Sequence, residues 1–261
     1  MKSVFKFLCI FSFVTLVVSC ASNKKTETAE EEQPKLPLLE SMTYEGYKEY
    51  SLKYDDKDRV IEYNDNNLHC VFEISYDPVK IKISYFTIDE NGGMKVNAVQ
   101  DIYDAVLNNA GFITAYKTQY ATGDMDPTVK YGSVELSYNS DNRLTEMRYS
   151  SGDRIGLEWD KDGGLSKVCT PEYDMTYTHS ETPNKSNQWN PLWYVCAGLE
   201  MTGLIGNPPS MLIDSGVQTF KNGVNSTANF EYKLKENKLI NEIIFREDDF
   251  EPKVYMVNYK D

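Results

Sequence analysis

The residues able to perform acid–base or metal chemistry are few and widely separated. His69 and His179 are the only histidines in the chain. Two imidazoles could bind a metal ion together with carboxylates, or one of them could act as a general base. Since no spacing in the sequence pairs them, we interpret both as surface or packed side chains. We predict no catalytic residue, no metal site and no cofactor.

The cysteines in the body of the chain carry no motif either. Cys70, Cys169 and Cys196 are the cysteines beyond residue 20. An odd number permits at most one disulfide, and no CxxC spacing indicates a metal or redox site. We expect buried thiols, and whether two of the three form a disulfide stays open.

Acidic side chains are abundant, with 40 Asp and Glu residues, but they form no recognisable site. The segments Asp160–Gly164 and Asp55–Asp58 resemble the start of a calcium-binding loop. Neither continues with the further oxygen ligands and the bidentate Glu that such a loop needs, so we predict hairpin turns at both places. A carboxylate pair for glycoside hydrolysis is retained as an alternative, although the abundance of acids distinguishes no pair.

Two tryptophans offer a surface for ligand stacking. Trp189 and Trp193 lie at the start of an apolar segment. An indole ring can stack on a sugar or anchor a hydrophobic core, and we favour the core while keeping both residues as weak ligand-stacking candidates. The chain has no GxSxG motif, no P-loop and no dinucleotide fingerprint, so we predict a protein that is not an enzyme.

A cysteine with the sequence context of a lipid attachment site ends the N-terminal apolar segment. Basic residues open the chain, and the apolar run Phe7–Val18 is shorter than a membrane span of about 20 residues. The sequence Leu16–Cys20 resembles the bacterial lipobox, which implies cleavage before Cys20 and acylation of its thiol and amine. We predict a signal peptide over residues 1–19 and a membrane anchor at Cys20. An ordinary secretory leader is the alternative.

We predict a flexible acidic tether over residues 20–40, followed by one domain over residues 41–261. The tether has two lysines, three consecutive glutamates and no apolar periodicity. An acidic cluster directly after a lipidated cysteine would favour surface export. Here Lys24 and Lys25 come first, so the leaflet stays open.

The charge balance argues against two classes of partner. The chain has 27 basic and 40 acidic residues, and loss of Lys2 and Lys6 with the leader leaves 25 against 40, a net charge of −15. Nucleic acid and an anionic bilayer surface carry the same sign and are disfavoured as partners.

Period-2 alternation closed by turn residues dominates the rest of the chain. Between residues 131 and 168, apolar residues alternate with polar ones in short runs separated by Asn-Ser-Asp-Asn and Asp-Lys-Asp-Gly-Gly turns. Residues 79–85 alternate the same way, which predicts Ile81 inside and Lys82 outside. One spacing, which we call the hairpin frame, recurs around the predicted turns. An aromatic residue at the end of one strand stands six positions before the aliphatic residue that begins the next strand, as in Tyr54 and Val60.

Two segments interrupt this rhythm. Residues 99–110 fit both helical spacing and the hairpin frame, and we favour the hairpin because Asn-Asn-Ala-Gly is poor helix interior. Residues 190–205 are apolar nearly all round and begin with Asn-Pro, which predicts a buried helix. Strands over residues 227–234, 239–246 and 253–259 close the chain. The predicted fold is therefore all-β, a single curved antiparallel meander of short hairpins, barrel-like and soluble, with one helix inserted near residues 190–205.

Several motifs together resemble a known family. They are TYTH at 176–179, Asn190-Pro191, the 203–210 loop and the final FEYKLKENKLINEIIF hairpin. They are similar to secreted Bacteroides-type lipoproteins of unknown function that are described as having a porin-like β fold. The resemblance covers about residues 42–261. It implies a fold and an envelope location but no functional residues. It does not imply a pore, because the expected strands of six to eight residues are shorter than the roughly 9–11 that cross a bilayer.

These observations lead to one functional prediction with two alternatives. We predict a β domain of the bacterial cell envelope, held on the outer membrane by the lipid on Cys20, that binds a ligand or a partner such as a glycan or a protein. A hydrolase of envelope or dietary glycan is one alternative, and it requires two acids about 5–9 Å apart in a cleft. A purely structural lipoprotein is the other.

Overall fold

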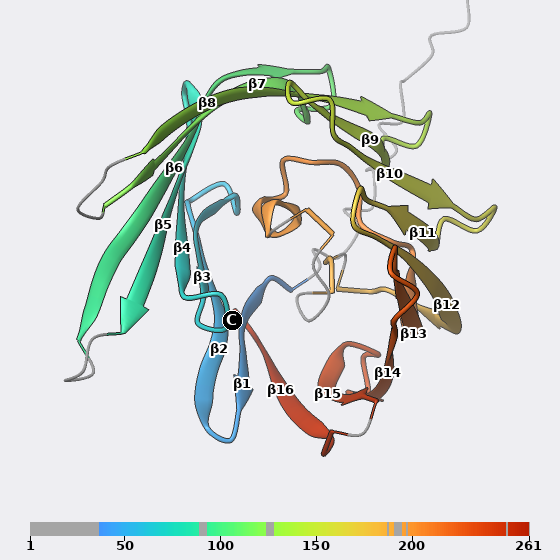
Figure 1. The fold of residues 1–261 in the computed structure, drawn as a ribbon. Coiled ribbons are helices and arrows are strands. Elements are labelled where there is room, and N and C mark those ends of the chain that lie inside the picture. Colours follow the sequence, from blue (N-terminus) through green and yellow to red (C-terminus); the bar gives the residue numbers. More distant parts are fainter. Residues whose placement is uncertain are drawn as a thin grey trace, which may run out of the picture. The chain divides into compact units, whose positions relative to one another are not determined.

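Sixteen antiparallel strands form a closed barrel in which each strand pairs with its sequence neighbours (Figure 1). The structure, a computed structural model, describes residues 37–88, 93–123, 128–186, 188–190, 195–196, 198–248 and 250–260. The strands are β1 (Leu39–Tyr44), β2 (Tyr47–Tyr54), β3 (Val60–Asp65), β4 (Cys70–Tyr76), β5 (Val79–Ile88), β6 (Met94–Leu107), β7 (Ile113–Thr122), β8 (Val129–Tyr138), β9 (Leu144–Tyr149), β10 (Arg154–Trp159), β11 (Leu165–Cys169), β12 (Tyr173–Pro183), β13 (Met211–Phe220), β14 (Asn225–Leu234), β15 (Ile240–Glu247) and β16 (Lys253–Tyr259).

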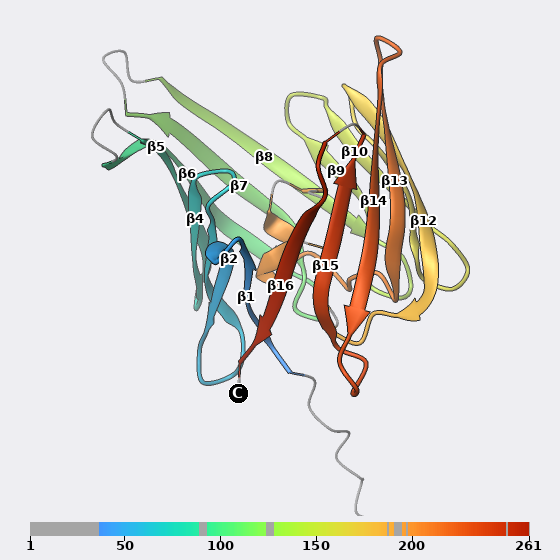
Figure 2. The ribbon, with the colours of Figure 1, turned by 90° about the horizontal axis from the view of Figure 1, so that it is seen from below.

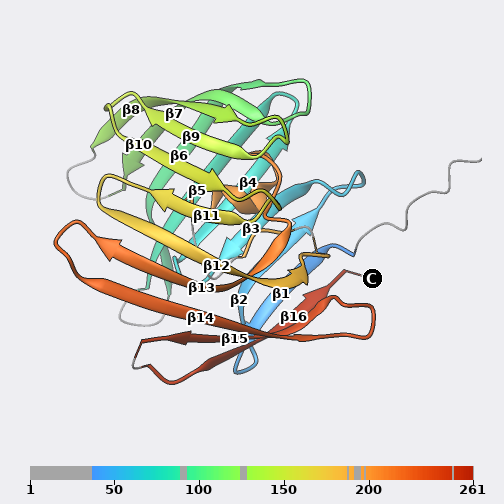
Figure 3. The same cartoon turned by 90° about the vertical axis from the view of Figure 1, so that its right-hand side faces the viewer.

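Closure joins the first strand to the last. β1 pairs with β16 in register from Leu39 opposite Tyr259 to Tyr44 opposite Tyr255, and the Lys260 amide donates to the Leu38 carbonyl at 2.8 Å. Because consecutive strands are antiparallel, the connections fall alternately at two ends of the barrel. We call the end that holds Leu38, Lys260 and the β12–β13 connection the mouth end. The opposite end, with the turns after β1, β3, β5 and so on, is the hairpin end (Figures 2 and 3).

The apolar side chains of the alternating strands fill the inside of the barrel. In β5, Val79, Ile81 and Ile83 are buried while Lys80 and Lys82 are exposed, so the predicted register is confirmed. Ile81 lies opposite Ile74 on β4 and Ile102 on β6, both of them core residues. A row of apolar side chains thus crosses three strands on one face, as expected for a half-buried antiparallel sheet.

One turn recurs along the chain and accounts for the predicted hairpins. In it, the first residue donates its N–H to the carbonyl of the fifth, and the fourth donates to the carbonyl of the first. The fourth residue has a left-handed φ, 82° at Gly163 and 56° at Asn142, which favours Gly or Asn there; Asp58 and Lys238 adopt the same conformation in two of the turns. The turn occurs at residues 55–59, 108–112, 139–143, 149–153, 160–164, 220–224 and 235–239.

An Asx side chain completes four of these turns. Oδ1 of the first residue accepts the N–H groups of the third and fifth residues at 2.8–3.0 Å; the first residues are Asp55, Asn108, Asn139 and Asp160. Asp55 and Asp160 are therefore turn residues, as predicted, since one oxygen of each carboxylate is occupied by the backbone.

Aromatic residues near the ends of strands, among them Tyr54, Tyr138 and Trp159 of the hairpin frame, tie neighbouring strands together at the mouth end. Each such side chain lies at or near the end of one strand and donates a hydrogen bond to a carbonyl at or near the start of the preceding strand. The pairs are Tyr54 with Leu39, Tyr76 with Val60, Tyr138 with Ile113, Trp159 with Leu144 and Tyr232 with Ile213, at 2.6–2.8 Å. Each bond satisfies a polar group that would otherwise be buried next to the core.

Two expectations about the elements are wrong. Strands of six to eight residues were expected, yet β6 has 14 residues and β12 has 11. Shifts of register, such as the one between Tyr85 and Phe86, bend these strands and allow them to run past the core. The segment 99–110, in contrast, is strand to Leu107 and then a turn, so the hairpin prediction is confirmed.

The helix expected near residues 190–205 is the second correction. Among the described residues of that segment, the helical structure is the 3-10 turn η1 (Leu199–Thr202); residues 191–194 and 197 lie outside the description. Gly198 and Gly203 flank η1 in left-handed conformation, which ends a helix on both sides. The segment is buried as expected. It crosses the inside of the ring of strands (Figure 1), where Val195, Cys196, Leu199, Met201, Leu204 and Ile205 join the core.

Candidate functional site

A depression of about 550 Å³ opens at the mouth end of the barrel, where the β12–β13 connection meets the strand ends. Four aromatic side chains line it: Tyr54, Tyr76, Phe112 and Trp189. The rest of its wall comes mainly from residues 200–208 of the connection and from the 55–59 turn. We call this the mouth depression.

The recurring turn positions a cation beside these rings. Arg59 closes the 55–59 turn, and its guanidinium lies 4.1 Å from the centre of the Tyr76 ring, within the range of a cation–π contact. Arg59 Nη2 also lies 2.6 Å from Asp55 Oδ2. The hydrogen bond from Arg59 lowers the pKa of the Asp55 carboxyl, so this pair is charged at neutral pH. The ring of Tyr76 is held by its bond to Val60, so both partners are fixed before any ligand arrives.

The connection is anchored to the strand ends through its backbone. The Ile113 amide donates to the Leu204 carbonyl at 2.9 Å, and the Asn207 amide donates to the Asn142 carbonyl at 2.9 Å. Gly206 adopts a φ of 97°, and a Cβ there would lie 2.7 Å from the Asn142 carbonyl oxygen. Only glycine permits this close approach, which seats the connection against the 139–143 turn.

A buried carboxylate organises the floor of the depression. Glu200 is 2% exposed, and its two carboxylate oxygens accept the N–H groups of Val195, Cys196 and Gly198 at 2.8, 3.2 and 3.1 Å. Burial raises the pKa of the Glu200 carboxyl, and the three N–H groups oppose this only in part. Both oxygens are thus turned into the backbone, and the group serves to shape the connection.

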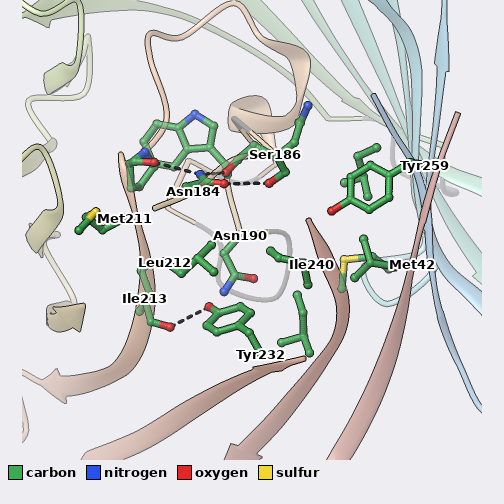
Figure 4. A pocket seen from close by; sticks show the side chains of 16 residues that line it. Met42, Asn184, Ser186, Asn190, Met211, Leu212, Ile213, Tyr232, Ile240 and Tyr259 are labelled. Atoms are coloured by element: carbon green, nitrogen blue, oxygen red, sulfur yellow. Dashed lines mark hydrogen bonds between the residues drawn. The ribbon is translucent and has the colours of Figure 1, made fainter. Parts of the chain in front are cut away.

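A smaller cavity lies deeper in the barrel, between the connection and strands β13–β16 and β1 (Figure 4). Its volume is about 40 Å³, which is room for a few water molecules and not for a sugar. The side chains of Leu212, Ile240 and Met42 contribute to its apolar wall. Asn184 closes one side by donating to the carbonyls of Gln188 and Pro209 at 2.7 and 2.9 Å.

Trp189 lines both the inner cavity and the mouth depression. It is 6% exposed and packs edge-on against Trp159, with ring centres 5.9 Å apart. Its indole Nε1 is buried without a hydrogen-bond partner among the described residues. Of the two predicted stacking candidates, Trp189 therefore borders a cavity while packing mainly as core. Trp193 lies outside the described residues.

A second polar cluster lies on the 139–143 and 160–164 turns, but its geometry is not that of a catalytic relay. His179 Nδ1 is 3.6 Å from Asp160 Oδ2, longer than a hydrogen bond, and Arg143 Nη2 donates to Ser210 Oγ at 2.7 Å. Burial would raise the pKa of the Asp160 carboxyl, but the Gly164 and Asp162 amides and the charge of His179 outweigh it, so the pKa is lowered.

The remaining predicted candidates are not brought together. His69 lies exposed in the β3–β4 turn, whereas His179 is on β12. Cys70, Cys169 and Cys196 are all free thiols, with Cys70 and Cys196 buried as expected and Cys169 half-buried. No group of His, Cys, Asp and Glu side chains within the described ranges is placed to hold a metal ion.

Sequence reasoning missed Tyr54, Tyr76 and Arg59 as site residues. The turn frame did mark Tyr54 and the 55–59 turn, but as structure. Nothing in the local sequence shows that these turns surround a depression, because the connection that forms its other wall is about 140 residues away. A search for aromatic residues next to a basic residue in the predicted mouth-end turns would have found Tyr54 and Arg59.

Comparison with known proteins supports the fold. Neither protein families nor curated proteins give a match to the sequence. Among solved structures, a porin-like protein from Bacteroides uniformis is similar, with a TM-score of 0.55 and 15% sequence identity over 81% of this chain and 90% of that chain. A porin-like protein from Bacteroides vulgatus matches with a TM-score of 0.45 and 13% identity over 85% and 99% of the two chains. The chain thus has an all-β, porin-like barrel fold.

Proposed function

We propose that this chain is a lipid-anchored β-barrel domain of the bacterial cell envelope that binds a glycan in the mouth depression. The observation that carries the ligand site is the 550 Å³ depression with four aromatic rings and a guanidinium already fixed in its wall. Aromatic faces stack on the apolar faces of sugar rings, and a planar guanidinium binds hydroxyl or carboxylate oxygens through several N–H groups. Pre-organised side chains lower the entropy cost of binding.

The polarity of the barrel wall supports attachment by a lipid and not by insertion of the barrel. A barrel that crosses a bilayer has an apolar outer band and a polar lumen. Here the hydrophobic core is inside, and charged side chains face outward on many strands, among them Lys53, Glu73, Lys82, Glu135 and Lys233. Several form ion pairs across strands, such as Lys82 with Glu73 at 3.5 Å. No helix in the described part of the chain is long and apolar enough to span a membrane.

The lipid anchor follows from the Leu16–Cys20 motif and the polar segment after it. Mass spectrometry of the membrane fraction should find a mature N-terminus at Cys20 that carries acyl chains. Cys20→Ala should release the protein from the membrane fraction. Recovery of the wild-type chain as an unmodified, unbound species would contradict the anchor.

The ligand site is tested by calorimetric titration of the chain from Ala21 onward with a panel of envelope and dietary oligosaccharides. Arg59→Ala should weaken binding about tenfold, because it removes both the cation and its contact with Tyr76. Lys57→Ala is the matched control, since Lys57 is an exposed basic residue of the same turn that does not line the depression. Equal affinity of the two variants, or no binding by any glycan, would reject the site.

No specific observation favours the hydrolase alternative. The carboxylates that line the mouth depression are Asp58 and Glu200. Glu200 binds backbone N–H groups with both oxygens, and Asp58 Oδ1 lies 3.5 Å from Lys260 Nζ. Release of shorter sugars during the titration would nevertheless identify a hydrolase and replace the binding proposal.

A further inference from the structure

The outer wall of the barrel carries an apolar patch at the hairpin end of β5–β8. Five large side chains are exposed there: Ile88, Met94, Val96, Val129 and Tyr131, each between 43% and 72%. We call these five residues the outer patch. The hairpins that carry it reach past the core (Figure 2), so their apolar side chains do not contribute to packing inside the barrel.

Strand register places the outer patch on one face. Ile88 lies opposite Met94, and Phe86 lies opposite Val96. One row further along, Val129 lies opposite Ala121, which lies opposite Val99. Directly opposed residues project to the same side of a sheet, so these pairs form adjoining apolar rows. That side is the outer one, because the next row on it contains Lys82, Asp101, Gln119 and Tyr131, and Lys82 is exposed.

Tyr131, at the β8 end of this row, is the last apolar residue of the patch, and the other three residues of the row are polar. Lys82 pairs with Glu73, and Lys117 pairs with Asp104 at 3.0 Å. Lys95 and Lys130 are exposed within the same hairpins, but they alternate with the patch residues and therefore project to the opposite side of the sheet. A cluster of exposed aliphatic residues with a tyrosine is the composition of a surface that rests in a membrane interface, where Tyr sits at headgroup level.

We propose that the outer patch rests on the surface of a zwitterionic bilayer, shallowly and without crossing it. The proposal rests on the lipid anchor proposed above, which keeps the domain beside a membrane. Residues 21–36 can extend to about 55 Å, and β6, the longest strand with 14 residues, spans about 46 Å. The anchor can therefore remain in the bilayer that the patch touches. The net charge of −15 from Cys20 onward repels anionic lipid, so the surface must be largely zwitterionic.

The test uses the chain from Ala21 to Asp261, which has no lipidation cysteine and therefore reports the patch alone. Flotation with phosphatidylethanolamine–phosphatidylcholine vesicles should recover the protein in the lipid fraction. Val96→Glu with Val129→Glu should reduce the bound fraction about tenfold, because two charges then enter the interface. Val254→Glu is the matched control, since Val254 is equally exposed, at 41%, on the outer wall at β16. It should float like the wild type.

Circular dichroism and a thermal melt establish that the charged variants remain folded; if they do not, Ile88→Asn with Met94→Asn replaces them. Absence of wild-type flotation on zwitterionic vesicles, or flotation of the double variant equal to the wild type, overturns the proposal. A dimer in solution that the double variant abolishes, without vesicle binding, assigns the patch to a second copy and also overturns it. None of these results depends on Cys20 acylation or on glycan binding, so they are distinct from a failure of the proposed function.

Discussion

At the scale of single residues, inward and outward positions of one strand differ sharply in what they tolerate. Ile81→Lys should lower the free energy of unfolding by several kcal/mol, because it places an ammonium group between Ile74 and Ile102. Lys82→Ile should change it by less than about 0.5 kcal/mol, since Lys82 is exposed and its ion pair with Glu73 is a surface pair. Urea denaturation measures both, and equal losses would contradict the register.

Glu200 makes stability depend on pH in a defined direction. Its pKa is raised in the folded state above the unfolded value of about 4.3. The folded chain therefore binds the proton more tightly, and the associated stabilisation is complete below the unfolded pKa and is lost as pH rises through the folded pKa. Glu200→Gln removes this titration. The urea midpoint of the wild type relative to the variant should therefore increase as pH falls from 8 to 5.

The control for this prediction is Glu236→Gln, an exposed glutamate in the 235–239 turn. The urea midpoint of the Glu236→Gln variant should stay equal to that of the wild type at every pH. If the curves of urea midpoint against pH were parallel for the wild type and Glu200→Gln, the Glu200 carboxyl would have the same pKa in the folded and unfolded states, which contradicts the prediction.

At the scale of elements, the recurring turn predicts how glycine substitutions differ. Gly163 and Gly223 occupy the same turn position, with φ of 82° and 86°. A Cβ at Gly223 meets nothing within 4 Å, whereas one at Gly163 would lie 2.3 Å from Arg143 Nη2 and 2.8 Å from Ser210 Oγ. Gly223→Ala should cost about 1–2 kcal/mol from the backbone alone. Gly163→Ala should cost more, because Arg143 must also move from its hydrogen bond with Ser210.

Thermal melts of the two alanine variants measure this difference. The larger loss at Gly163 should become smaller in an Arg143→Ala background, since the guanidinium is then absent and only the Ser210 hydroxyl is left close to the new Cβ. A Gly163 variant no less stable than the Gly223 variant would mean that the turn does not hold Arg143 as described.

At the scale of the whole barrel, the position of the chain ends predicts tolerance to circular permutation. Leu38 and Lys260 are joined by a backbone hydrogen bond of 2.8 Å, so a short linker can connect residues 37 and 260. A new opening between Asn222 and Gly223, in an exposed turn, should preserve the circular dichroism spectrum and most of the stability. An opening between Gly198 and Leu199 should not, because it separates Glu200 from the three N–H groups that it binds.

Much of the local structure was predictable because it depends on neighbours in sequence. Alternation over residues 79–85 determines which side of β5 is buried. Asp or Asn followed by Gly or Asn three residues later marks the turns at 108–112, 139–143 and 160–164. The hairpins at residues 108–112 and 160–164 needed no distant contact to be recognised. The predicted calcium-like segments were correctly assigned to turns for the same reason.

Only the tertiary structure decided how these hairpins close and what they enclose. Pairing of Leu39 with Tyr259 joins residues 220 positions apart, and no pattern within either strand specifies that partner. The 190–205 segment is apolar enough to predict a helix. Glu200, however, accepts the N–H groups of residues 195, 196 and 198, and Gly198 and Gly203 bound η1, the helical turn among the described residues of the segment. The mouth depression and the outer patch arise in the same way, since both are assembled from side chains whose proximity depends on strand register and barrel closure, which are non-local interactions.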